Sequence, residues 1–174
     1  TGHTNSDNAE TFLLNLARGS SYRGLGGIPK KRLLNKNSFL IRPILIFSRE
    51  DTKNICKTMK IPIWEDPTNS DLKIKRNLIR EKVVNVLEDI YPGFTKRINN
   101  FSAKMNSFQR EQLDLSKLAL ETCSNNDEID RRIFNSISQE ARSTLLNTFI
   151  RKKGTKQMST KNIDELSNAI FTKN

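Results

Sequence analysis

Three side chains that could move protons or hold a charge lie close together near the start of the chain. They are His3, Asp7 and Glu10, within the stretch 2–11. Asp7 and Glu10 are three residues apart, so a helix places them on one face, one turn from each other. Two carboxylates and an imidazole can hold a cation or accept a proton. The simpler interpretation is a helix start, with Asp7 as the N-cap and Glu10 completing a capping box.

A second polar set, Arg76, Asn77 and Arg80, lies near the start of a helix that the apolar spacing predicts over residues 72–88. Arg80 follows Arg76 by four residues, so both project from nearly the same side. The planar fork of arginine suits phosphate, and the pair could reach one phosphate together. The alternative is an ordinary solvated face.

Several short motifs occur in a fixed order along the first half of the chain. They are Gly-His-x-x-x-Asp-x-Ala-Glu-Thr (2–11), Leu-x-Arg-Gly-Ser (16–20), Gly-Leu-x-Gly-Ile-Pro (24–29), Ile-Arg-Pro-Ile-Leu (41–45), Ser-Arg (48–49), Ile-Trp-Glu-Asp-Pro-Thr-Asn (63–69) and Arg-Asn-Leu-Ile-Arg (76–80). In this order they resemble the catalytic domain of tRNA(Ile)-lysidine synthetases, which belong to the PP-loop (N-type) ATP pyrophosphatases. Each motif alone is weak, but the ordered series is hard to produce by chance.

The resemblance implies an α/β fold, the C-terminal part of a doubly wound adenine-nucleotide α-hydrolase-like domain, over residues 1–90. An all-helical, tRNA-binding domain is expected over 91–174. The implied reaction uses ATP with Mg²⁺ to adenylate the wobble cytidine of tRNA(Ile) with a CAU anticodon. The amine of free lysine then displaces AMP, which forms lysidine.

The resemblance also supplies the candidate site. It places four residues in the family's active site as catalytic: His3, Asp7, Glu10 and Arg80. The predicted substrate-binding residues are Arg18, Glu65, Asp66, Arg76 and Asn77. The carboxylates would hold lysine, and the arginines would hold pyrophosphate and the RNA backbone. Ser6 replaces a second acidic residue common in the family, which puts a metal role of this loop in doubt.

One family motif is absent from these residues. The pyrophosphate-binding loop Ser-Gly-Gly-x-Asp-Ser does not occur, and the glycines of 19–27 follow neither that pattern nor a P-loop. Those glycines suit tight turns or close approach to a ligand. We therefore expect the chain to be a fragment that does not bind ATP productively alone.

The composition describes a basic protein with few metal ligands. Thirty Lys and Arg against 19 Asp and Glu give a net charge of +11, which favours a polyanionic partner, and the helical half is expected to supply the basic surface. One histidine and two distant cysteines, Cys56 and Cys123, predict no metal site and a reducing compartment, the cytoplasm or a plastid stroma. No apolar run approaches transmembrane length. The sequence leaves the oligomeric state open, a homodimer included.

The elements that must position these residues follow from caps and periodicity. The first helix is expected to end at Arg18-Gly19, followed by a loop to Asn37 and an extended segment over 39–45. Ser48 should cap a helix whose buried side is Ile55, Cys56 and Met59. Asp71 should cap the helix over 72–88. The inner face of that helix is expected to consist of Ile74, Leu78, Ile79, Val83, Val86 and Leu87. Pro92-Gly93 marks a break. Helices are then expected over 94–123, 129–137 and 139–153, and from Ser159 or Thr160 onward.

Three alternatives stay open. Another PP-loop enzyme, such as a tRNA thiolase, usually needs paired cysteines for an iron–sulfur cluster, and the chain has none in a paired motif. A non-catalytic basic helical RNA-binding module or remnant fits the charge equally well but gives no reason for His3, Asp7 and Glu10. A helical interaction protein gains only from the apolar stripe of the C-terminal half, which is more simply core.

Overall fold

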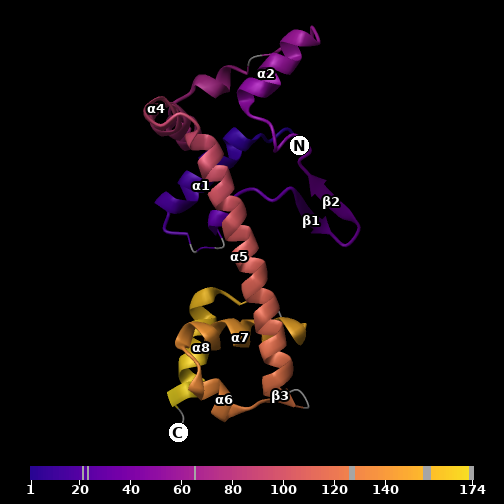
Figure 1. Ribbon diagram of the computed structural model, residues 1–174, viewed down its shortest axis with the longest axis vertical. Helices are drawn as coiled ribbons and strands as arrows, with labels where there is room; N and C mark the ends of the chain where they lie inside the picture. The colour runs from indigo at the N-terminus through magenta and orange to yellow at the C-terminus, as the bar shows by residue number, and fades with distance from the viewer. Residues whose placement is uncertain (21, 23, 65, 126–127, 155–157, 173–174) are drawn as a thin grey trace. The chain divides into compact units, whose positions relative to one another are not determined.

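Helices form most of the molecule (Figure 1). The structure, a computed structural model, describes residues 1–20, 22, 24–64, 66–125, 128–154 and 158–172. The chain divides into two units, Thr1–Ser107 and Phe108–Asn174, inside the long helix α5 (Phe94–Cys123). The sequence analysis placed the domain boundary at residue 90, just before α5. The division of roles between a catalytic and a tRNA-binding domain stays a prediction.

Helix α1 (Asn5–Ala17) begins earlier than predicted. Its N-cap is Thr4, whose side chain accepts from the backbone N–H of Asp7, while the Asp7 carboxylate accepts from the backbone of Thr4. Asp7 is therefore the third helical residue of the capping box, and the prediction of Asp7 as N-cap was wrong. Glu10 is left free of capping. One face of α1 packs inward, with Ala9 and Phe12 buried and the ring of Phe12 edge-on to Phe101 of α5.

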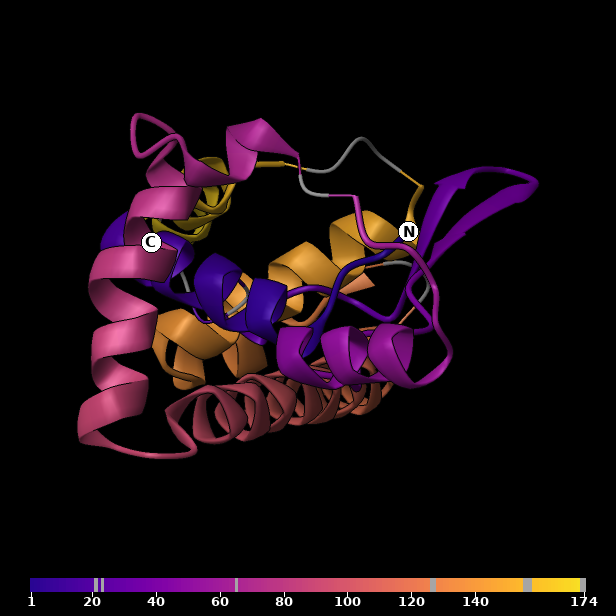
Figure 2. The same ribbon diagram turned by 90° about the horizontal axis from the view of Figure 1, so that it is seen from above.

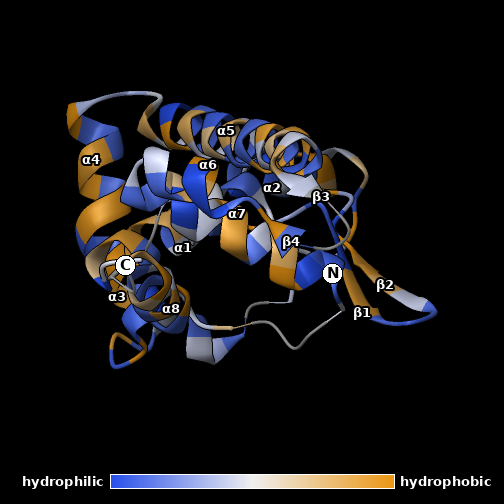
Figure 3. Ribbon diagram, turned by 90° about the horizontal axis from the view of Figure 1, so that it is seen from below, coloured by the Kyte–Doolittle hydropathy of each residue, from blue (hydrophilic) through white to orange (hydrophobic). Residues whose placement is uncertain are grey.

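An antiparallel hairpin follows, where a loop to Asn37 was expected. Strand β1 (Lys31–Asn35) pairs with β2 (Ser38–Ile41), with a bulge between Leu33 and Asn35. Figure 2 shows the two strands beside one another, joined by their turn at one end. In Figure 3 the strands carry orange, apolar stretches and the turn is blue. The extended segment predicted over 39–45 ends at Ile41, because Pro43 has no N–H to continue the ladder.

Helix α2 (Arg49–Thr58) confirms its predicted start and contradicts its predicted core. Ser48 is the N-cap and Asp51 completes the capping box. No residue of α2 is buried: Ile55 is 41% exposed and Met59 is 65% exposed. The spacing of apolar residues shows which face of α2 is apolar. Among the described residues of the first unit, no element covers that face.

The helix predicted over 72–88 starts later and is not regular. It consists of α3 (Lys75–Ile79), a π-helical turn η3 (Arg80–Val84) and α4 (Asn85–Ile90), preceded by the short 3-10 turn η2 (Pro67–Ser70). Asp71 does not cap it, since Ile74 is the N-cap residue. Half of the predicted inner face was also wrong: Ile74, Leu78 and Val86 are more than 40% exposed, whereas Ile79, Val83 and Leu87 are half-buried. The buried residues are Asn77 and Val84.

The second unit is helical as predicted. After α5 come a two-stranded hairpin β3 (Ser124–Asn125) and β4 (Glu128–Ile129), then α6 (Arg131–Ser136), α7 (Gln139–Lys152) and α8 (Thr160–Thr172). Ser138 caps α7, and Gly154, at φ 70°, follows its end, so both predicted signals are confirmed. Its core consists of Leu120, Phe134, Leu145, Leu146 and Ile163.

Both sheets among the described residues are two-stranded and antiparallel, and these residues form no parallel pair of strands. No helix in this described part of the chain is both long enough and apolar enough to cross a membrane.

Candidate active site

Five charged side chains from four helical elements meet in the first unit. Asp7 and Glu10 come from α1, Arg49 is the first residue of α2, Arg76 lies in α3 and Arg80 opens η3. Four ion pairs connect them. We refer to these five residues as the arginine–carboxylate cluster. Three guanidinium groups face two carboxylates, so the cluster keeps a surplus positive charge.

Glu10 is the most enclosed member of the cluster. Its side chain is 1% exposed, and both carboxylate oxygens are used. Oε1 accepts from Nε of Arg80 at 2.6 Å, and Oε2 accepts from Nε of Arg76 at 2.7 Å and from Nη2 of Arg80 at 3.3 Å. A carboxylate buried this deeply needs such partners, because an unpaired buried charge is strongly unfavourable.

Asp7 is less enclosed, with 14% of its side chain exposed. Oδ2 accepts from the N–H and hydroxyl of Thr4, at 2.7 and 2.8 Å, and Oδ1 accepts from Arg76 at 3.2 Å and Arg49 at 3.4 Å. Burial raises the pKa of Asp7, but the Thr4 hydrogen bonds and the charges of Arg76 and Arg49 outweigh it. The pKa therefore lies below its ordinary value, and Asp7 is ionised at neutral pH.

Asn77 joins Arg80 to the loop that precedes α3. Its Nδ2 donates to the carbonyls of Thr68 and Asp71 at 2.8 and 2.9 Å, and its Oδ1 accepts from Arg80 at 3.5 Å. Buried Asn77 thus ties η2 to α3 from inside the unit. Its place is that of a positioning residue, while the predicted contact with substrate stays a prediction.

Residues 1–87 match the family model described as PP-loop domain. The chain belongs to the PP-loop domain family. The match contains all five residues of the arginine–carboxylate cluster and ends within α4.

Relatives of this PP-loop chain match both of its units. It is 58% identical over 173 residues to a tRNA(Ile)-lysidine synthase of Prochlorococcus marinus subsp. pastoris, covering 99% of this chain and 52% of that protein. A tRNA(Ile)-lysidine synthase of another Prochlorococcus marinus strain is 39% identical over 170 residues, which cover 98% of this chain and 51% of that protein. One of Coxiella burnetii is 31% identical over 174 residues, covering 98% and 38%. The chain spans about half the length of the Prochlorococcus relatives.

Among the described residues, no hydrogen bond or ion pair joins His3, Arg18 or Asp66 to the side chains of the cluster. Nδ1 of His3 is 3.0 Å from the hydroxyl of Thr1. Arg18 is the exposed C-cap residue of α1, eleven residues after Asp7 and so about 16 Å along the helix. Asp66 caps η2 by accepting from the N–H and hydroxyl of Thr68. Glu65 lies outside the described residues. Their roles stay predictions.

Arg49 is the cluster member that the sequence analysis did not select. Its backbone N–H donates to Oγ of Ser6 at 3.2 Å, and its guanidinium reaches Asp7 while its side chain stays 43% exposed. Ser6, where an acidic residue is common in the family, thus holds the start of α2. The Ser48-Arg49 motif was the available signal. It contains Arg49 but gives no indication that its partner is Asp7, 42 positions away.

Three backbone groups of the segment 24–28 are used within the first unit. The carbonyl of Gly24 accepts from Asn15, that of Gly26 accepts from Asn106, and the N–H of Ile28 donates to Asn8. These contacts hold the segment against α1 and α5. The guanidinium groups of the cluster fit a phosphate. Among the described residues no group of three or more His, Cys, Asp or Glu could hold a metal ion.

Proposed function

We propose that the protein to which this chain belongs is an ATP-dependent ligase that forms lysidine. It joins lysine to C2 of the wobble cytidine in tRNA(Ile) with a CAU anticodon. The observation that carries the proposal is the extent of the similarity to proteins named tRNA(Ile)-lysidine synthase. It runs through the PP-loop domain and the helical unit alike, at 58% identity over 99% of the chain.

The reaction has two steps. The C2 oxygen of cytidine attacks the α-phosphate of ATP, and pyrophosphate leaves. The amine of lysine then attacks C2, the C2–O bond breaks, AMP leaves with that oxygen, and the amine loses a proton. Phosphate charge must be neutralised in the first step and a cationic substrate must be held in the second.

The arginine–carboxylate cluster meets both needs in this proposal. Its surplus positive charge attracts a phosphate, and Arg76 and Arg49 are the more exposed guanidinium groups. Asp7, ionised and partly exposed, can hold the ammonium of lysine. Its lowered pKa makes it a weak proton acceptor, so it acts by charge. Glu10 acts through Arg76 and Arg80 by holding them in place.

ATP with Mg²⁺, free lysine and tRNA(Ile) are the proposed substrates and partners. The Mg²⁺ ion would accompany the ATP phosphates. The proposed location is the cytoplasm or a plastid stroma, where tRNA is modified, and a homodimer is the proposed assembly to test.

The direct test is incorporation of labelled lysine into a tRNA(Ile) transcript with a CAU anticodon by the complete protein. We expect incorporation that requires ATP, releases one AMP and one pyrophosphate per lysine, and is lost with a transcript whose wobble base is uridine. Asp7→Asn should abolish incorporation, whereas the exposed Asp89→Asn, with the same change of charge, should not. ATP-dependent transfer of sulfur to tRNA, without lysine incorporation, would identify a thiolase instead. Binding of tRNA with neither reaction would leave the RNA-binding module.

A further inference from the structure

The positive charge of the chain is concentrated in the first unit, above all in the segment 11–49. Residues 1–107 carry 19 Lys and Arg against ten Asp and Glu, whereas residues 108–174 carry 11 against nine. Between Glu10 and Glu50 there are eight Lys and Arg and no acidic residue. Long-range attraction of an RNA backbone is therefore directed to the first unit. The sequence analysis expected that surface in the helical half.

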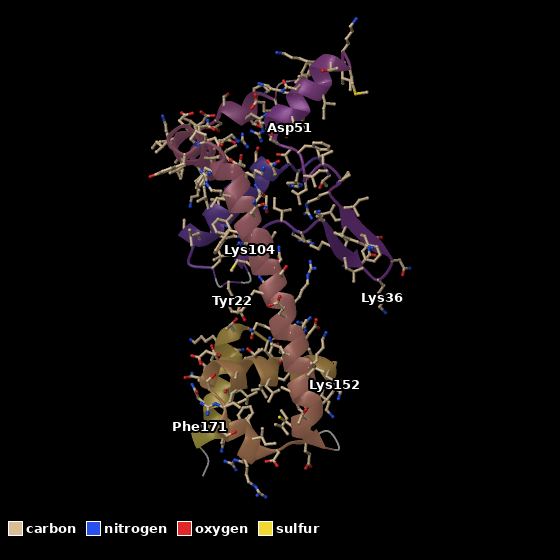
Figure 4. The ribbon with its side chains drawn as sticks, in the orientation of Figure 1. Tyr22, Lys36, Asp51, Lys104, Lys152 and Phe171 are labelled. Carbon is tan, nitrogen blue, oxygen red and sulfur yellow. The ribbon has the colours of Figure 1, made fainter. Side chains whose placement is uncertain are left out.

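The centre of this segment is the hairpin β1–β2. Residues 29–39 are all exposed, and they include Lys30, Lys31, Arg32 and, at the turn, Lys36 (Figure 4). Among the described residues, no acidic side chain forms an ion pair with any of these four. Exposed cations without an acidic partner are available to a polyanion without first breaking an ion pair.

Hydrogen bonds from Arg42 hold the base of the hairpin. Arg42 is 9% exposed, donates from Nη1 to the carbonyl of Pro29 at 2.7 Å, and donates its backbone N–H to the carbonyl of Lys30 at 3.0 Å. Arg42 is thus a structural cation. It holds the two strands together where they leave the rest of the unit, so the exposed cations have a defined spacing.

An aromatic side chain lies among the cations. Phe39 is 54% exposed, and Nζ of Lys31 lies 3.9 Å from its ring centroid. Proteins that bind single-stranded nucleic acid combine cationic side chains, which contact the phosphates, with exposed aromatic rings, on which bases stack.

We propose that hairpin β1–β2 is a tRNA-binding surface of this protein. Lys30, Lys31, Arg32 and Lys36 contact the phosphate backbone, and Phe39 offers a ring for a base. The identity of the RNA rests on the proposed function, whereas the binding surface rests on charge and exposure.

A groove of about 500 Å³ in the second unit is the competing surface. It is lined by Leu113, Lys117, Leu120, Glu121, Thr148, Arg151 and Lys152. Lys117 is already paired with Asp114 at 2.9 Å. The carboxylate of Glu121 also lines the groove and lowers its net positive charge. Arg151 and Lys152 stand at the C-terminal end of α7, where the helix dipole repels an anion. The hairpin is therefore favoured over the groove.

The test compares three variants of the complete protein in binding to a tRNA(Ile) transcript with a CAU anticodon over a range of KCl concentrations. Lys31→Gln/Arg32→Gln/Lys36→Gln removes three charges from the hairpin. Lys117→Gln/Arg151→Gln/Lys152→Gln removes the same charge from the groove. Lys31→Arg/Arg32→Lys/Lys36→Arg keeps the hairpin charge.

We expect the hairpin variant to bind tRNA at least about tenfold more weakly at low salt, with the slope of log affinity against log salt reduced by about 2 to 3. The KM for tRNA should rise in parallel with this loss of affinity. The charge-preserving variant should bind like the wild type, and the groove variant should lose much less affinity than the hairpin variant.

Four results would overturn the proposal. The first is an unchanged affinity and salt slope in the hairpin variant, and the second is an equal loss of affinity in the groove variant. The third is no binding of tRNA by the wild type. The fourth is an altered sedimentation coefficient of the hairpin variant with unchanged tRNA affinity, which would make the hairpin a protein-binding surface. A wild type that binds tRNA but forms no lysidine contradicts the proposed function alone. In that case the binding curves still decide the role of the hairpin.

Discussion

Glu10 and Arg80 are 70 residues apart in the chain, yet Nε of Arg80 donates to Oε1 of Glu10 at 2.6 Å in a site where the Glu10 side chain is 1% exposed. This pair joins helix α1 to the π-helical turn η3. A π-helical turn is rare and often marks a functional site, and here it begins at the arginine that Glu10 holds. The contact thus connects the two motifs that carry the predicted catalytic residues.

Removing the Glu10 carboxylate should destabilise the protein. Glu10→Gln leaves Arg76 and Arg80 without their buried counter-charge, and we expect a loss of about 3 kcal/mol in the free energy of unfolding. Urea unfolding of Glu10→Gln, Arg80→Gln and the double variant measures the coupling. A favourable coupling above about 1 kcal/mol is expected, and a coupling near zero would contradict the pairing.

Arg49 should matter more for activity than for stability. Its ion pair with Asp7 is long and 43% of its side chain is exposed, so Arg49→Ala should cost less than about 1 kcal/mol of unfolding free energy. Lysidine formation by the complete protein should nevertheless fall more than about tenfold, since a charge aimed at the site is lost. Lys53→Ala, one turn along α2, is the control. Wild-type turnover in Arg49→Ala would exclude a role for this residue.

Gly27 should tolerate no side chain. Its φ is +69°, and a Cβ would overlap the amide oxygen of Asn8 and the hydroxyl of Ser102. Asn8 cannot turn away without losing its hydrogen bonds to Ile28 and Asn99. Gly27→Ala should therefore cost about 2 to 4 kcal/mol of unfolding free energy. Gly19→Ala has the same φ and nothing within 4 Å, so it should cost only about 1 kcal/mol. Equal costs would show that the close packing at Gly27 is not significant.

Asp7 should contribute to the loss of stability in acid. Its pKa is below the ordinary value in the folded protein, so its contribution is fully present above the ordinary carboxyl pKa of about 4. Below that pH the unfolded chain binds the proton first, and stability falls until the folded pKa is passed. Asp7→Asn should make the unfolding free energy less dependent on pH between about 5 and 2, measured by urea unfolding. Asp89→Asn corrects for the change in net charge, and an unchanged pH dependence in Asp7→Asn would contradict the assignment.

Local signals predicted the helices well. The Ser48 and Ser138 caps and the stop after α7 at Gly154 were confirmed, because each depends on residues within one turn of the helix end. The start of α1 was misplaced, since Thr4 and Asp7 offer two equivalent capping oxygens within four residues. The hairpin was missed because its turn, Lys36-Asn37, lacks glycine.

The sequence by itself determined the ends of most helices and the placement of Asp7 and Glu10 on one helix. It also determined the high density of positive charge between residues 11 and 49. Only the tertiary structure decided which charges meet. Arg49 reaches Asp7 across 42 positions, and Arg76 reaches Glu10 across 66. The tertiary structure also decided which apolar faces are covered, and it leaves Ile55 of α2 and its C-cap residue Met59 exposed. The physical reason is range: caps and periodicity act within a few residues, whereas burial and ion pairing depend on elements that the chain brings together from far apart.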